Sequence, residues 1–169
     1  MGKKILNREV VTLALLVAIL PPAWAVCAPY VGNTVGPIAL ISAGIYGANN
    51  NQFKDALKIS IGYLLGDLWA LISAEVMARP VINGDLQLFL TLFVMGFLVV
   101  IISNMAPKYI YMPSWLAGWA IGMLTMNLDA ETPRLSLFIQ IAVAMLVGVY
   151  YVGALMDRIH RLVNRNKGN

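Results

Sequence analysis

The sequence predicts an all-α integral membrane protein with six transmembrane helices, and this prediction follows from composition and chain length. Apolar residues make up 60% of the chain and charged residues only 12%, whereas a soluble domain is nearer to a quarter charged. The mean hydropathy is correspondingly high, at +0.76. A bilayer-spanning helix needs about 20 residues, so a chain of 169 residues holds roughly six spans in a single transmembrane domain.

The predicted spans are separated by short turns that contain Asn, Gly, Pro or charged residues. They cover about residues 10–28, 31–48, 56–78, 86–106, 109–128 and 135–156. Pro21 and Pro22 lie inside the first span. Because each proline removes a backbone donor, the pair is expected to break or kink that helix.

Lysine and arginine residues fall unequally on the two sides of this six-span arrangement. Only Arg79 and Arg134 occupy the turns on the side opposite the termini. The other ten basic residues share the side of the termini: Lys3, Lys4, Arg8, Lys54, Lys58, Lys108, Arg158, Arg161, Arg165 and Lys167. Because basic residues gather in cytoplasmic segments, the split predicts that both termini are cytoplasmic.

The two halves of the chain resemble each other when one is shifted by 82 residues. The shift pairs Gly66 with Gly148, Trp69 with Tyr151, Glu75 with Asp157, Gly36 with Gly118, and Pro21-Pro22 with Ser103-Asn104. Three spans in each half make the second half inverted in the membrane. Inverted repeats with matching interrupted helices are typical of transporters whose solute path lies between the repeats. The alternative is an old duplication that now serves only helix packing.

The third predicted span carries an acidic residue, Asp67, at its centre. An intramembrane acid is costly and is usually functional. Helical periodicity places Ser60, Tyr63 and Asp67 on one polar-to-small face, opposite an aliphatic face. This stripe is a candidate lining for a solute path, and the alternative is an acid that ties helices together through a hydrogen bond.

Other candidates for the path are polar or aromatic residues at membrane depth. Gln140 offers both a donor and an acceptor to a solute, and large aromatic side chains can narrow a path: Trp24, Trp69 and Tyr151. Glu75 and Asp157 lie near opposite membrane surfaces, where they either guard the two mouths or serve as ordinary interfacial acids.

The sequence contains no motif for catalysis, a cofactor or a metal site. His160 is its sole histidine, and Cys27 is its sole cysteine. No Walker-type phosphate loop is present, so transport would be passive or driven by an ion gradient. The net charge of +4 follows from the basic residues on one membrane side, and it does not indicate nucleic-acid binding.

With these features in place, the chain resembles the YcdZ-like group of small six-span bacterial inner-membrane proteins of unknown function. The resemblance covers about residues 10–155 and rests on Trp24, Gly36 and Gly44, the Gly66-x-x-Trp69-Ala70 run, and the Pro113-to-Gly118 opening of the fifth span. It implies a bacterial inner membrane location. Asp67 departs from the group's pattern, in which an apolar residue is usual at this position.

These observations favour a channel or facilitator for a small polar, neutral solute such as urea, ammonia or a related amide. The path would run between the first, third, fourth and sixth spans. A proton-coupled transporter that uses Asp67 is the second hypothesis, and a non-transporting scaffold or accessory subunit is the third. Besides the lipid bilayer and the solute, we expect a second copy of the chain as a partner, because Gly-rich spans offer close-packing faces.

Overall fold

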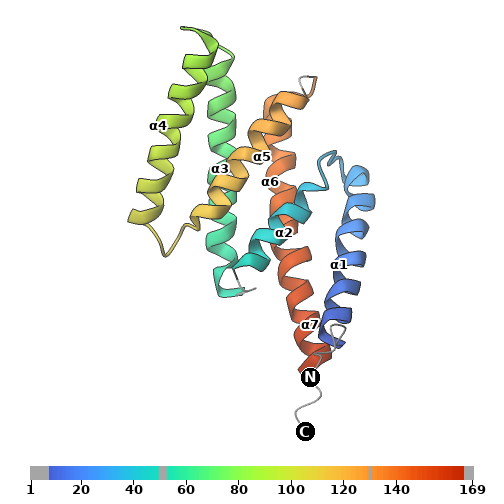
Figure 1. The fold of residues 1–169 in the computed structure, drawn as a ribbon. Helices are drawn as coiled ribbons and strands as arrows, with labels where there is room; N and C mark the ends of the chain where they lie inside the picture. Colours follow the sequence, from blue (N-terminus) through green and yellow to red (C-terminus); the bar gives the residue numbers. More distant parts are fainter. Residues whose placement is uncertain (1–7, 50–52, 130, 166–169) are drawn as a thin grey trace, which may run out of the picture.

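All regular secondary structure in the described part of the chain is helical. The computed structural model describes residues 8–49, 53–129 and 131–165. In chain order the elements are α1 (Arg8–Cys27), η1 (Ala28–Val31), α2 (Ile38–Ala48), η2 (Phe53–Asp55), α3 (Ala56–Met77), α4 (Gly84–Met105), α5 (Met112–Leu128), α6 (Arg134–Val147), η3 (Gly148–Leu155) and α7 (Met156–Arg165) (Figure 1). Because α6, η3 and α7 follow one another without a break, they form one long rod.

Four helical stretches in the described residues are long and apolar enough to cross a bilayer. They are Val10–Val31, Phe53–Met77, Gly84–Met105 and Arg134–Val163, and they match four of the predicted spans. Their outer surfaces carry large exposed apolar side chains, such as Phe89, Phe93 and Phe97 on α4. The chain is therefore a multi-pass membrane protein whose outer face contacts lipid.

The other two predicted spans, 31–48 and 109–128, correspond to shorter helices. Helix α2 begins only at Ile38 and has 11 residues, a length of about 16 Å, which is shorter than the bilayer core. It starts late because Gly32 adopts a left-handed φ of 77° and Pro37 occupies the N-cap position. Helix α5 has 17 residues, or about 25 Å.

The expected break at Pro21 and Pro22 is absent, because α1 continues through both prolines to Cys27. Helix α4 likewise continues past Ser103 and Asn104. Prolines are tolerated inside transmembrane helices more readily than in soluble ones. The irregular stretch lies instead in the last rod, where η3 is π-helical, and such stretches often occur at functional sites.

The helices form two similar groups around α3 and the α6–α7 rod (Figure 1). Helix α4 packs beside α3, and α1 packs beside α7. The two shorter helices cross the long ones obliquely: α5 packs on α3, and α2 packs on η3 and α6.

Glycines let α5 approach α3 closely. A Cβ atom at Gly118 would lie 2.7 Å from the Tyr63 carbonyl oxygen, and one at Gly62 would lie 2.7 Å from the Tyr111 carbonyl oxygen. Since real Cβ atoms do not approach backbone this closely, only glycine fits at these positions. The crossing of α2 over η3 is built in the same way, with Gly148 against Ala39 and Gly153 against the Tyr46 ring.

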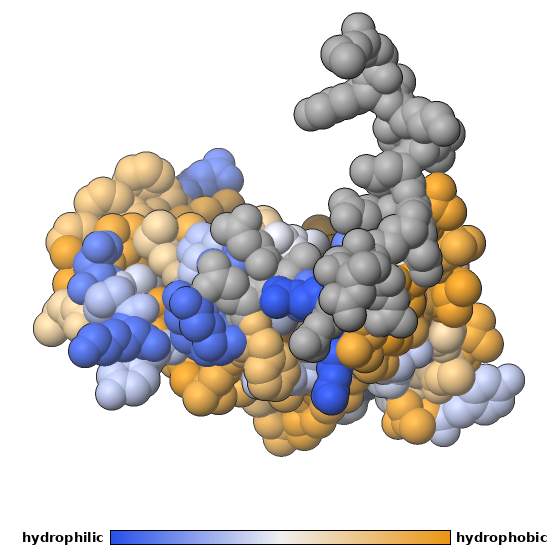
Figure 2. All heavy atoms as spheres, turned by 90° about the horizontal axis from the view of Figure 1, so that it is seen from below, coloured by the Kyte–Doolittle hydropathy of each residue, from blue (hydrophilic) through white to orange (hydrophobic). Residues whose placement is uncertain are grey.

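The two ends of the bundle differ in charge. The end at which α1 begins and α7 ends carries Lys54, Lys58, Lys108, Arg158 and Arg161, and the opposite end carries Arg79 and Arg134. Figure 2 shows hydrophilic residues on the first end, with apolar residues continuing to its edges. The predicted contributions of Lys3, Lys4 and Lys167 lie outside the described residues, as do the side chains of Arg8 and Arg165.

Candidate functional site

Asp67 is fully buried where α3 packs against α5. Its relative exposure is 0%, and neither carboxyl oxygen has a hydrogen-bond partner among the described residues. The surrounding residues are small: a Cβ atom at Gly122 would lie 3.1 Å from the carboxyl oxygen Oδ1 and would also press on Ala70. The glycine-rich crossing therefore encloses a carboxyl group without giving it a partner.

The polar stripe predicted around Asp67 exists, and it faces the protein interior. Ser60 and Tyr63 are both buried, while Leu64 and Leu68 on the opposite face are 37% and 40% exposed. The Ser60 hydroxyl donates to the Ala56 carbonyl oxygen of its own helix, over 2.8 Å. The Tyr63 hydroxyl, one helical turn from Asp67, has no partner among the described residues. Two unpartnered polar groups therefore lie one turn apart on α3.

Such an arrangement costs free energy, because a buried polar group without a hydrogen bond loses its hydration and gains nothing in return. Native proteins keep few such groups, so each one calls for an explanation. Asp67 is the sole acidic residue among the buried residues of the described chain. A proton, a cation or a solute with N–H donors that reached this carboxyl would offset the cost.

Trp69 lies two residues after Asp67 but turns toward α4. Its indole Nε1 donates to the Met95 carbonyl oxygen over 3.3 Å, and its ring meets that of Trp115 edge to face, with centroids 5.1 Å apart. Nearby, Trp119 Nε1 donates to the Ser73 hydroxyl over 2.9 Å. Trp69 thus helps to hold α4 and α5 on α3.

Trp24 and Tyr151 belong to a different cluster from Trp69. Trp24 Nε1 donates to the Gly36 carbonyl oxygen over 3.1 Å. Both aromatic side chains pack on Ala39, Ala43 and Val152, on the side of the molecule where α1 lies, far from α4 (Figure 1). The structure does not bring Trp24 and Trp69 together to narrow a common path.

Gln140 anchors the start of α2 to α6. Its side-chain oxygen accepts hydrogen bonds from the Thr34 backbone N–H over 2.8 Å and the Thr34 hydroxyl over 2.9 Å. Its side-chain nitrogen Nε2 donates to the Ser136 hydroxyl over 3.2 Å, and its backbone carbonyl oxygen accepts from the Asn33 side chain over 2.8 Å. The Gln140 side-chain oxygen, which was expected to accept a hydrogen bond from the solute, is therefore occupied by Thr34.

The two predicted mouth residues lie at opposite ends of the bundle, and each pairs with an arginine. Glu75 accepts from Arg134 over 2.8 Å, and Asp157 lies 2.9 Å from Arg161. Exposed pairs of this kind contribute little stability. Near Glu75, in the turn after α5, the backbone N–H and the hydroxyl of Thr132 both donate to Asp129 and lower the pKa of its carboxyl.

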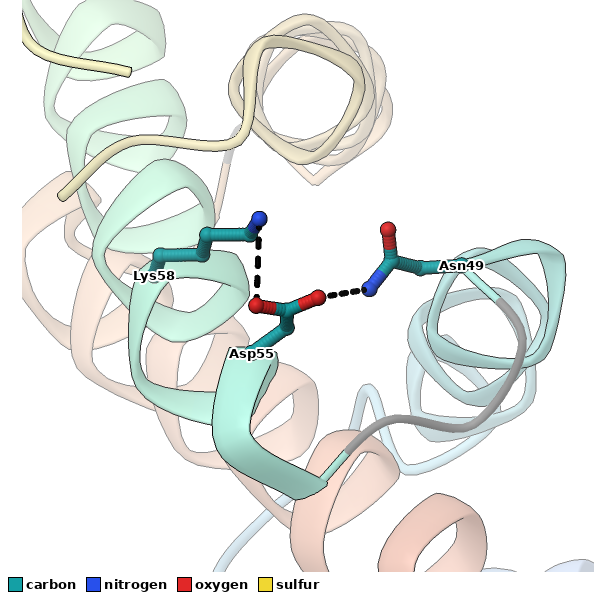
Figure 3. Close-up of polar contacts among 3 residues, drawn as sticks. All are labelled: Asn49, Asp55 and Lys58. Atoms are coloured by element: carbon teal, nitrogen blue, oxygen red, sulfur yellow. Dashed lines mark hydrogen bonds and ion pairs between the residues drawn. The ribbon is translucent and has the colours of Figure 1, made fainter. Parts of the chain in front are cut away.

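Sequence reasoning missed a polar cluster at the basic end, where α2 leads into α3. Asp55 accepts a hydrogen bond from the Asn49 side chain over 2.8 Å and lies 3.1 Å from the Lys58 ammonium group (Figure 3). The Lys58 carbonyl oxygen in turn accepts from the Tyr111 backbone N–H over 3.3 Å. The i, i+3 spacing of Asp55 and Lys58 was the available signal. This cluster joins α2, α3 and the start of α5.

The polar groups do not assemble a metal centre. Among residues 8–49, 53–129 and 131–165, no group of three or more His, Cys, Asp or Glu side chains lies close enough together to hold a metal ion.

Comparison with known proteins identifies a family whose function is unknown. A family model described as "Protein of unknown function (DUF1097)" matches residues 14–160. No curated protein and no solved structure matches the chain.

Proposed function

The chain belongs to the DUF1097 family of proteins of unknown function, and we propose that it carries a small polar solute across the membrane with Asp67 as the binding group. The observation that carries this proposal is the burial of an unpartnered carboxyl group in the middle of a bilayer-length helix. Residues of this kind within the bilayer typically belong to substrate or proton paths.

The chemistry of the site favours a solute with N–H donors, a proton, or both. The unpartnered carboxyl can accept two or more hydrogen bonds, which suits urea, ammonia or a small amide. Besides Asp67, the buried polar residues of the described chain are uncharged. A neutral solute is therefore a better match than a multivalent ion.

The pattern of helix contacts supports an inverted repeat of α1–α3 and α4–α7. In the second half of the chain, α5 packs on α3, and in the first half α2 packs in the same way on α6 and η3. Likewise, α4 packs on α3, and its counterpart α1 packs on η3 and α7. Corresponding helices also run in opposite directions (Figure 1). This arrangement is typical of secondary transporters with a central binding site.

The same packing supports part of the 82-residue match and corrects another part. Gly66 is pressed against Trp115 and Gly118 of α5, and Gly148 against Ala39 of α2, so these two glycines occupy equivalent crossings. Gly36 lies before α2, against Trp24, whereas Gly118 lies within α5. Gly36 and Gly118 are therefore not equivalent.

Chain direction supports six membrane crossings in the proposed arrangement. Helix α1 ends at one end of the bundle and α3 begins at the other, so the segment that contains α2 returns the chain across the membrane (Figure 1). The segment that contains α5 does the same between α4 and α6. Together with the basic residues at one end, this favours cytoplasmic termini in a bacterial inner membrane, as in the YcdZ-like group.

Burial favours a transporter over an open pore. Asp67 is enclosed on all sides, and Trp24 and Trp69 lie in separate clusters, so the passive channel expected from the sequence has less support. In an alternating mechanism, the halves would move to open Asp67 first to one side and then to the other. A proton on Asp67 would couple that movement to the ion gradient.

Reconstituted liposomes test the proposal. Uptake of urea, ammonium or small amides is measured between pH 5 and 8, with and without a pH gradient, for the unmutated protein, Asp67→Asn and the matched control Asp85→Asn. We expect gradient-driven uptake that falls at least about tenfold in Asp67→Asn, the order of a lost charge-assisted interaction, and persists in Asp85→Asn. If the unmutated protein moves none of these solutes faster than protein-free liposomes, the proposal fails.

A further inference from the structure

At the basic end of the molecule, a cleft separates η2, which leads directly into α3, from the η3–α7 rod. Its volume is about 740 Å³, and Phe53 and Lys54 face Tyr150, Leu155 and Arg158 across it. Binding pockets for small molecules commonly have volumes of this order. The cleft is distinct from the Asp67 site, because Asp67 does not line it.

The cleft combines apolar and basic side chains. Phe53 is 68% exposed, and Tyr150 and Leu155 also expose their apolar atoms. Lys54 and Arg158 form no ion pair with a described side chain, whereas Arg161, also at the cleft, is paired with the nearby Asp157. The acid in the lining is therefore already offset by an arginine, and the two exposed cations Lys54 and Arg158 form no ion pair within the described part of the chain.

The position of the cleft decides which ligand fits. It lies where the bilayer-length helices Phe53–Met77 and Arg134–Val163 reach the basic end of the bundle, which is the level of the lipid headgroups. Anionic headgroups bind in basic pockets between transmembrane helices on the cytoplasmic side. Apolar walls beneath the cations would accept the first methylene groups of the acyl chains.

We propose that this cleft binds an anionic phospholipid of the inner leaflet, with Lys54 and Arg158 holding the phosphate group and Phe53, Tyr150 and Leu155 contacting the glycerol and upper acyl region. The bound lipid would occupy the space between η2 and the η3–α7 rod, and so fix their spacing next to the π-helical stretch.

Native mass spectrometry of the detergent-solubilised protein tests this proposal. Phosphatidylglycerol and phosphatidylcholine with identical acyl chains are offered together, and the lipid adducts are counted. We expect the unmutated protein to retain phosphatidylglycerol in preference, and Lys54→Gln/Arg158→Gln to lose roughly 30-fold in that preference, the combined effect of two basic residues near a lipid surface. The matched control Arg79→Gln/Lys108→Gln removes the same charge outside the cleft and should keep the preference.

Three results would overturn the assignment. The unmutated protein could retain both lipids equally, or the control variant could lose as much preference as the cleft variant, which would show that net charge alone attracts the lipid. Alternatively, glycerol phosphate without acyl chains could displace phosphatidylglycerol at equal concentration, which would make the cleft a site for small anions. Unfolding temperatures of the three proteins, measured in the same detergent, confirm that each variant is folded.

Discussion

Asp67 differs from the other buried polar residues because it is the sole acid among them, and neither of its carboxyl oxygens has a hydrogen-bond partner among the described residues. Ser60 and Ser73 donate to carbonyl oxygens one turn earlier, and Gln87 donates to Val76 and Arg79. These side chains contribute to the packing of the bundle. The Asp67 carboxyl group makes no such contact with a described residue, so stability does not account for its presence.

Replacement of the Asp67 carboxyl group by an amide should therefore leave stability intact. Asp67→Asn keeps the shape and breaks no hydrogen bond, so we expect the free energy of unfolding to fall by less than about 0.5 kcal/mol, or to rise. Ser73→Ala is the contrasting variant, because it leaves the buried Trp119 indole N–H without its acceptor and should cost about 0.6–1.7 kcal/mol. Thermal unfolding in detergent compares the two. A larger loss in Asp67→Asn than in Ser73→Ala would mean that the carboxyl ties helices together.

Periodicity in the sequence predicted which face of α3 carries Asp67, but not what that face meets. A helical repeat of 3.6 residues puts Ser60, Tyr63 and Asp67 together and Leu64 and Leu68 opposite. Helix α5 covers the polar stripe because Gly118 and Gly122, about fifty residues later in the chain, let it approach α3 closely. The lack of a partner for Asp67 is likewise a property of three-dimensional packing, which no local pattern contains.

At the scale of elements, apolar length identified the four long helices, and local geometry decided the rest. Helix α2 is short because of the left-handed Gly32 and because Thr34 is held by Gln140, a residue of α6. The π-helical stretch of η3 coincides with close contacts from Gly148 and Gly153 to α2. Neither feature follows from hydropathy, because both depend on contacts between segments far apart in sequence.

The crossing of α3 and α5 should be intolerant of even one added methyl group. In Gly118→Ala, the new Cβ atom would lie 2.7 Å from the Tyr63 carbonyl oxygen and 3.2 Å from its Cα atom. Because both are backbone atoms and cannot rotate away, the helices must separate, at a cost of about 1–3 kcal/mol.

Gly96→Ala is the matched control for this crossing, because Gly96 lies inside α4 with no atom within 4 Å of the added Cβ position. It should be neutral or stabilise the helix by up to about 1 kcal/mol. Urea or thermal unfolding in detergent measures both variants. Equal stability of the two would show that α3 and α5 do not approach as closely as described.

At the scale of the whole molecule, the helix directions favour the six membrane crossings that we propose. Counted by length alone, four helices span the bilayer. Four crossings would require α1 and α3 to be joined on one side, yet α1 ends at the end of the bundle opposite the start of α3 (Figure 1). In the six-span arrangement that we propose, the short α2 and α5 cross as parts of longer irregular segments, which is tolerated where the backbone is covered by protein.

Single-cysteine labelling tests the resulting six-span topology with both termini in the cytoplasm. The native Cys27 is exposed, so it is first replaced by alanine. In this background, Asn83→Cys, between α3 and α4, should react with a membrane-impermeant maleimide from the periplasmic side, because this end carries few basic residues. Lys108→Cys, between α4 and α5 at the basic end, should react only after the membrane is ruptured.

The opposite labelling pattern would mean that both termini face the periplasm. The basic cleft would then lie in the outer leaflet and not in the inner leaflet. Labelling of both positions from the same side would mean that α4 does not cross, which would contradict the proposed inverted repeat and, with it, the alternating access that we propose at Asp67.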